Sequence, residues 1–152
     1  MPVKPIPEGY HTVTPYLVVR GAARTLEFAK KAFGAEVLGE PMKRPDGEIM
    51  HAEFKIGDSR LMISESSEQH PPMQTMLYLY VPDVDAVYRR AVSAGAISTM
   101  EPMDQFYGDR SGGVKDPSGN HWYIGTHKED VAPQELKKRA EAHFKAQQGK
   151  AA

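Results

Sequence analysis

Two side chains near the middle of the sequence have the types and the spacing for acid–base chemistry: His51 and Glu53. They fall within residues 49–56, where apolar and polar residues alternate with the period of a β-strand. Side chains two apart on a strand point to the same face, so this imidazole and this carboxylate would face the same way. The pair can serve as a general acid and base, or the two residues can simply be neighbours on one strand.

The other histidines and the lack of cysteine limit the metal chemistry that the chain can support. For His51 and His121, a place in a polar cavity beside a hydrogen-bond partner is favoured over a role as a metal ligand. There is no cysteine, which excludes disulfides, thiolate nucleophiles and thiolate metal sites and is typical of a reducing cytoplasm. The remaining histidines are expected at the surface: His11, His70, His127 and His143.

Charge and terminal composition exclude several classes of partner. The chain has 19 Lys and Arg against 20 Asp and Glu, and its net charge of -1 gives no electrostatic reason to expect binding to nucleic acid or to an anionic membrane. Residues 1–7 contain no apolar run, so we expect neither a signal peptide nor a transmembrane span. We therefore expect a cytoplasmic protein, whose 152 residues suffice for one domain.

A glycine-rich segment, residues 108–113, has the composition of a phosphate-binding loop without its context. A phosphate-binding loop leads into the N-terminus of a helix, whereas a strand is predicted to follow here. We therefore expect a mobile flap over a ligand site, with Arg110 reaching toward that site and with Phe106 and Tyr107 closing over it.

Strand and helix patterns follow one another in an order that occurs twice. In the first half, the patterns predict a strand over residues 12–19, a helix over 22–33 and strands over 37–42, 49–56 and 60–64. In the second half, they predict a strand over 76–81, a helix over 83–94 and strands over 97–100, 109–115 and 121–126. A charged helix is predicted over 133–147. Pro15 lacks a backbone donor, which places the first strand at a sheet edge or a bulge.

The two halves repeat with an offset of roughly 61 residues, the size of a duplicated supersecondary unit. Each unit is a strand, a helix and three more strands, so its sheet has a helix on one face and needs cover on the other. We predict an α+β fold of two βαβββ units whose mixed sheets pair into a half-barrel cup, with the helices outside and an extra C-terminal helix. The expected bounds are residues 1–10 for an N-terminal arm, 11–127 for the domain (unit one 11–66, unit two 75–127) and 128–152 for a C-terminal helical tail.

Several short motifs, in this order and spacing, resemble one family. They are residues 14–17, 33–35, 50–53, 57–58, 107–112, 116–122 and 126–130. Together they cover roughly residues 10–130 and are similar to the vicinal-oxygen-chelate superfamily of glyoxalases, bleomycin-resistance proteins and extradiol dioxygenases. Within that superfamily, the sequence resembles the PhnB-like, or glyoxalase-like, branch.

The resemblance implies four positions that decide the chemistry. Metal-dependent members take one ligand, usually His or Glu, from the first and last strand of each unit, and the ion then polarises the oxygens of the substrate. The corresponding positions in this sequence are Thr14, Met62, Met76 and Tyr123. Two thioethers, a hydroxyl and a phenol do not hold a hard divalent ion. We therefore expect no metal and no other cofactor.

The first functional hypothesis is a metal-free protein that binds a small organic molecule in the cup. Strand parity directs Tyr16, Tyr78, Tyr123, His51 and Glu53 into one shared cavity, with Arg110 at its rim, although plain core packing would produce the same pattern. Adaptable Met and flat Tyr surfaces suit a planar guest, and Glu53 could pair with a cation. The complete predicted ligand-binding set is Tyr16, His51, Glu53, Met62, Met76, Tyr78, Arg110, His121 and Tyr123.

Two alternatives remain open. One is an enzyme of the glyoxalase or isomerase type, with His51 and Glu53 as candidate catalytic residues. It would use either a displaced divalent metal held by His51, His121 and Glu53 or His51 as a metal-free base. The other is an interaction domain that uses the fold only as a scaffold. In each case we expect a homodimer, because relatives commonly pair by exchanging units. The cup faces would be completed either by the second chain or by the other unit of the same chain.

Overall fold

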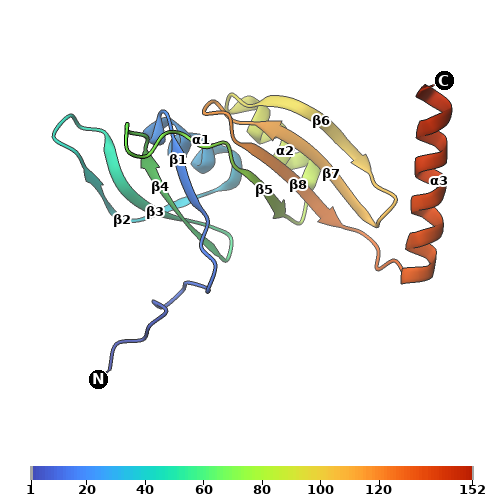
Figure 1. Ribbon diagram of the computed structural model, residues 1–152, viewed down its shortest axis with the longest axis horizontal. Helices are drawn as coiled ribbons and strands as arrows, with labels where there is room; N and C mark the ends of the chain where they lie inside the picture. Colours follow the sequence, from blue (N-terminus) through green and yellow to red (C-terminus); the bar gives the residue numbers. More distant parts are fainter. Residues whose placement is uncertain (1, 152) are drawn as a thin grey trace.

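The computed structural model describes residues 2–151 and contains two four-stranded mixed sheets and three helices (Figure 1). Unit one has β1 (Tyr16–Val19), α1 (Ala22–Phe33), β2 (Glu36–Lys43), β3 (Ile49–Ile56) and β4 (Ser59–Glu65). Unit two has β5 (Met76–Tyr80), α2 (Val84–Ser93), β6 (Ile97–Asp104), β7 (Asp109–Lys115) and β8 (His121–His127), and α3 (Pro133–Ala151) follows. The predicted α+β fold of two βαβββ units with a C-terminal helix is confirmed. Residues 1 and 152, which end the predicted arm and tail, lie outside the described range.

The two sheets have the same strand order, which confirms the internal repeat. The orders are β1-β4-β3-β2 and β5-β8-β7-β6, and in each sheet the first and last strands of the unit run parallel. The register places Tyr16 beside Met62 in one sheet and Tyr78 beside Tyr123 in the other. Within the described residues, no strand of one sheet pairs with a strand of the other, so the chain forms no closed barrel.

Two strands differ from their predicted lengths for reasons that involve proline. β1 begins at Tyr16 rather than at residue 12, and Pro15 contributes only its carbonyl, which accepts from the Met62 amide at 3.0 Å. β6 continues to Asp104, beyond the predicted end at residue 100. It is an edge strand that tolerates Pro102 where its register with β7 shifts.

The helices begin and end where side chains and glycines satisfy the backbone. At the start of α1, the Glu65 carboxylate of β4 accepts from the amides of Gly21 and Ala22 at 2.7–3.2 Å. The helix ends at Phe33, as predicted, and Gly34 follows it in a left-handed conformation. The Asp83 side chain accepts from the Ala86 amide at 3.1 Å and starts α2. The Glu65 contact thus secures α1 against the sheet of its own unit, and the Asp83 contact caps α2 locally.

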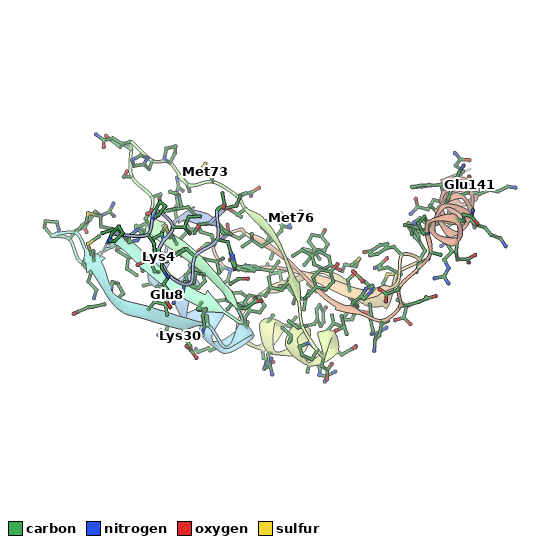
Figure 2. The ribbon with its side chains drawn as sticks, turned by 90° about the horizontal axis from the view of Figure 1, so that it is seen from below. Lys4, Glu8, Lys30, Met73, Met76 and Glu141 are labelled. Carbon is green, nitrogen blue, oxygen red and sulfur yellow. The ribbon has the colours of Figure 1, made fainter. Side chains whose placement is uncertain are left out.

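The two units pack together through their helix sides. α1 and α2 lie on the same side of the two sheets, opposite the side that carries Met76 (Figures 1 and 2). Phe33 of α1 contacts the fully buried Trp122 of β8, with ring centroids 4.9 Å apart. Thr25 of α1 is hydrogen bonded to Ser118, in the turn before β8, at 2.6 Å. This packing buries the helix-facing sides of both sheets, and within residues 2–151 neither sheet covers the opposite face of the other.

The C-terminal helix α3 stands at one end of the molecule (Figure 1). Its Arg139 guanidinium binds both carboxylate oxygens of Glu129 at 2.8 and 2.9 Å and donates to the Phe106 carbonyl at 3.3 Å. His143 packs on Phe106 with ring centroids 4.8 Å apart. The helix is therefore docked on the turn between β6 and β7. Across residues 2–151, no helix has the length and apolar character needed to span a membrane.

The turn of residues 116–120 is organised by one buried carboxylate. Asp116, only 4% exposed, accepts from the amides of Ser118 and Asn120 at 2.9 Å. It also accepts from Asn120 Nδ2 at 3.0 Å and from the Trp122 indole at 2.8 Å. Because four donors depend on this group, the turn holds Trp122 at the centre of the interface between the units.

We predict that Asp116→Ala lowers the free energy of unfolding by about 2–4 kcal/mol, because it leaves buried donors without partners. Urea unfolding followed by the fluorescence of Trp122 measures this change. The control is Asp58→Ala, in the exposed turn between β3 and β4, which we expect to stay within about 0.5 kcal/mol of the parent. Equal effects of the two substitutions would contradict this account of the turn.

Candidate ligand-binding faces

The face of each sheet opposite the helices is called here its cup face. On sheet one, strand parity places Tyr16, His51, Glu53 and Met62 on this face, because Leu61, Ile63 and Phe54 between them are buried against the helix. The Tyr16 hydroxyl is hydrogen bonded to Nδ1 of His51 at 3.0 Å. The structure therefore brings together four predicted site residues of unit one.

The N-terminal arm adds a residue that the sequence did not reveal. The Tyr10 phenol donates to the Glu53 carboxylate, and the Arg60 guanidinium lies 5.3 Å from the centre of the Tyr10 ring. Burial and the bond to Glu53 raise the pKa of Tyr10 to about 12. Within the arm, the Tyr10 amide donates to the Pro7 carbonyl at 3.1 Å and closes a turn. No periodic pattern in the arm indicated this contact.

On sheet two, the cup face carries Met76, Tyr78, His121 and Tyr123. The register sets Met76 beside His121 and Tyr78 beside Tyr123, while Trp122 and Ile124 point to the helix side. The Tyr78 and Tyr123 rings are parallel within 4°, with centroids 6.5 Å apart. Tyr78 is 38% exposed and Met76 is 64% exposed. This face therefore presents an aromatic and thioether surface whose Met76 and Tyr78 side chains are exposed.

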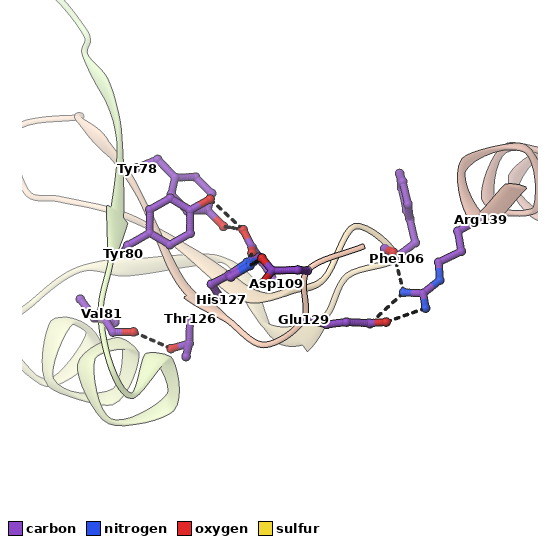
Figure 3. Close-up of polar contacts among 10 residues, drawn as sticks. Tyr78, Tyr80, Val81, Phe106, Asp109, Thr126, His127, Glu129 and Arg139 are labelled. Atoms are coloured by element: carbon purple, nitrogen blue, oxygen red, sulfur yellow. Dashed lines mark hydrogen bonds and ion pairs between the residues drawn. The ribbon is translucent and has the colours of Figure 1, made fainter. Parts of the chain in front are cut away.

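A cluster around Asp109 lies at one end of the same face, and of its members only Tyr78 was in the predicted set. Asp109 Oδ2 accepts from the phenols of Tyr78 and Tyr80 at 3.1 and 3.0 Å, and Oδ1 is hydrogen bonded to His127 Nδ1 at 2.8 Å (Figure 3). Burial acts to raise the pKa of Asp109, but bonds from His127, Tyr80 and Tyr78 outweigh it and hold that pKa below its ordinary value. His127 was expected at the surface, and half of its side chain is exposed.

Arg110 lies on the other side of β7, away from the cup face. Its guanidinium binds both carboxylate oxygens of Asp85 in α2 at 2.8 and 2.9 Å. Val114, on the same strand and four residues on, is fully buried on the helix side, so parity directs Arg110 to that side too. The expectations of Arg110 at the cup rim and of a mobile flap over 108–113 are therefore not met, because residues 109–115 form β7 in the middle of the sheet.

The predicted residues form two groups on two sheets rather than one cavity. A cavity of about 530 Å³ between the units is lined by Tyr78, Phe33, Ile56 and Trp122, among others. It is not lined by Tyr16, His51, Glu53 or Tyr123. Because the units pack through their helix sides, the two cup faces do not close on each other within one chain.

The residues at the four metal-ligand positions of the fold do not fit a divalent metal. Tyr123 and Met62 occupy equivalent places in the two units, beside Tyr78 and Tyr16. Thr14 precedes β1, and its hydroxyl donates to the His11 carbonyl at 3.5 Å. Thioether, phenol and hydroxyl groups are poor ligands for hard divalent ions. Among the described residues, His, Asp and Glu nowhere form a group of three that could hold a metal ion.

Several known proteins resemble this chain. The uncharacterised protein Rv0887c of Mycobacterium tuberculosis is 36% identical over 135 residues, which cover 82% of this chain and 79% of that protein. The crystal structure of TioX from a Micromonospora species has 22% identity and a TM-score of 0.61, covering 76% of this chain and 98% of TioX. The structure of TnmS3, an antibiotic-binding protein from a Streptomyces species, has 21% identity and a TM-score of 0.62, covering 78% of this chain and 96% of TnmS3.

The family model of the Glyoxalase/Bleomycin resistance protein/Dioxygenase superfamily matches residues 10–124. That range contains both βαβββ units, including the register that places Tyr16 beside Met62 and Tyr78 beside Tyr123. The chain belongs to the Glyoxalase/Bleomycin resistance protein/Dioxygenase superfamily.

Proposed function

We propose that this protein binds a small organic molecule between its cup faces, without a metal. The observation that carries the proposal is the exposed tyrosine and methionine surface of both sheets, which includes Tyr16, Met76 and Tyr78. Exposed apolar patches beside polar groups commonly mark binding sites. Flat aromatic rings and flexible thioethers suit a planar guest, for which His51, Glu53 and His121 provide polar contacts.

A fold-level comparison supports this proposal. TnmS3 is an antibiotic-binding protein of the same fold, so the two-unit scaffold can carry a site for a small organic molecule. By the order of its motifs, we assign the chain to the PhnB-like branch of the superfamily. We also propose a cytoplasmic location, and residues 11–127 as the functional domain between an N-terminal arm and a C-terminal tail.

We propose that the site is completed by a second copy of the chain. The two groups of site residues lie on separate sheets, and β5 is an edge strand. The backbone groups of Thr75 and Val81 are hydrogen bonded to β8. In a parallel pair of strands, every second residue of one strand bonds to the other strand, and the residues between them face away from it. The backbone groups of Met76, Tyr78 and Tyr80 therefore face the free edge. A homodimer in which unit one faces unit two of its partner would cover this edge and unite both groups.

One contact favours a second candidate function. The Tyr16 hydroxyl holds His51 Nδ1 at 3.0 Å, which orients the imidazole and leaves Nε2 for a substrate. An isomerase or glyoxalase-type enzyme could use His51 as a base in this way. It could instead use a displaced metal held by His51, Glu53 and His121. The residue types at the four metal-ligand positions favour a binding protein over an enzyme.

The first test of this proposal is binding of proflavine, a flat fluorescent tricycle. We expect Tyr123→Ala and His51→Ala to weaken binding at least about tenfold while the fold stays intact. The matched control, His70→Ala in the exposed linker, should bind as the parent does. If the two residues are core instead, the substitutions will cost about 2–5 kcal/mol of stability, and the parent chain will show no binding to lose.

The second test is metal content. We expect elemental analysis of the purified protein to show less than stoichiometric Zn, Ni, Fe or Mn, and EDTA to leave the melting temperature unchanged. A bound ion would stabilise the native state, so its removal would lower that temperature. If the parent chain holds one metal ion and His51→Ala holds none, the result would favour the enzyme with a displaced metal instead.

The third test is oligomeric state. Light scattering at micromolar concentration should give twice the chain mass of 16.9 kDa. We expect Met76→Lys, at the free edge of β5, to shift the protein toward the monomer, because a charge at an edge strand opposes pairing. Val92→Lys, at an exposed position on α2, is the control and should remain dimeric. A monomeric parent chain would remove the proposed pairing.

A further inference from the structure

The cluster around Asp109 connects the cup face of unit two to the C-terminal segment (Figure 3). Asp109 is the first residue of β7 and is 5% exposed. Three donors converge on its carboxylate: the phenols of Tyr78 and Tyr80 on one oxygen and His127 on the other. A buried carboxylate is costly unless it is paired and hydrogen bonded, so these contacts depend on one another.

The cluster determines what Tyr78 and Tyr80 can offer to a guest. Each phenol has one hydrogen, and each donates it to Asp109. The pKa of Tyr78 is raised by burial and by this bond, and that of Tyr80 chiefly by the bond. A Cβ at Gly125 would overlap the Tyr78 ring, so this glycine leaves the space in which that ring lies against β8. The two tyrosines therefore present ring faces rather than hydroxyl donors.

His127 connects the cluster to the segment that precedes α3. Its Nδ1 faces Asp109, and its Nε2 is hydrogen bonded to the fully exposed Asp130 at 2.8 Å. Bonds to Asp130 and to Asp109 raise the pKa of His127. The amides of Lys128 and Glu129 donate to the Gly108 carbonyl at 2.8 and 3.1 Å. The position of the imidazole is thus set by backbone contacts of the segment that leads to α3.

We propose that His127 is a positioning residue of the ligand site: through Asp109 it holds the Tyr78 and Tyr80 rings in the orientation that a flat guest stacks on. This inference rests on the proposed binding function and narrows its ligand class. The guest is a planar ring system that needs no hydrogen bond from Tyr78 or Tyr80. Polar recognition then comes from His51, Glu53 and His121.

The cluster could instead serve only to hold β7, β8 and β5 together. In that case, loss of His127 would lower stability and leave the affinity of the folded protein unchanged. A positioning role requires that affinity change in the folded protein and that it return with any side chain that donates to Asp109. Affinity and stability are therefore measured on the same variants.

The experiment titrates proflavine fluorescence in three variants and measures their melting by circular dichroism. His127→Leu keeps a similar volume without a donor, and we expect it to weaken binding about five- to tenfold. His127→Asn places an amide donor near the position of Nδ1 and should restore binding to within about twofold of the parent. Asp130→Asn, which alters only the outer contact, should also bind as the parent does. Weakened binding in His127→Leu that His127→Asn does not rescue would overturn the proposal.

A double-mutant cycle tests whether His127 acts through Asp109. Asp109→Asn should weaken binding as His127→Leu does, and the double variant should be no weaker than Asp109→Asn alone, because both substitutions break one connection. Additive losses would overturn the proposal. If His127→Leu does not fold, Asp109→Asn and Tyr80→Phe carry the same test at nearly constant volume. Asp109→Asn weakens the acceptor of all three bonds and Tyr80→Phe removes one of them, and parental affinity in both would overturn the proposal.

The outcomes separate this inference from the proposed function. If the parent binds proflavine and Tyr123→Ala weakens it, but His127→Leu binds as the parent does and merely melts earlier, the binding function stands and the positioning role falls. If the parent does not bind proflavine, both fall together.

Discussion

The packing of the two units through their helix sides is the constraint on which the rest of the structure depends. Trp122 contacts Phe33 across this interface, and the Asp116 carboxylate holds the turn that places Trp122 there. Because α1 and α2 contact each other on one side of both sheets, the opposite faces of the sheets do not cover each other within one chain. An exposed sheet face and a free edge at β5 follow directly, and both favour association with a second copy.

Each cup face holds a carboxylate, and the two carboxylates are bonded by different parts of the chain. Each carries a carboxylate within a largely apolar surface, and each carboxylate accepts from tyrosine phenols. Glu53 accepts from Tyr10, which belongs to the N-terminal arm outside the sheets. Asp109 accepts from Tyr78 and Tyr80, which belong to the sheet itself. The face of unit two is therefore held by its own strands, whereas that of unit one depends on the arm.

Much of the fold could be predicted from sequence, because its signals are periodic and local. Alternation in residues 49–56 identified β3 and placed His51 and Glu53 on one face, and Gly34 ended α1 as predicted. The failures lie where periodicity carries no information. In β7, Gly112 and Gly113 hide the alternation, so the sequence did not assign Asp109 to the cup face or Arg110 to the helix side. Tyr10 was missed because its contact is between segments far apart in sequence.

The residue types at the four ligand positions change what would order the proposed site. In a metal-dependent member, an ion bound at four positions would fix four side chains at once. Here Tyr123 occupies one of those positions, and its ring lies parallel to that of Tyr78 within 4°. Fixed orientation of the neighbouring Tyr78 then has to come from the protein. A buried carboxylate with three donors provides it, because any rotation of the Tyr78 phenol away from Asp109 removes one hydrogen bond from a carboxylate that is only 5% exposed.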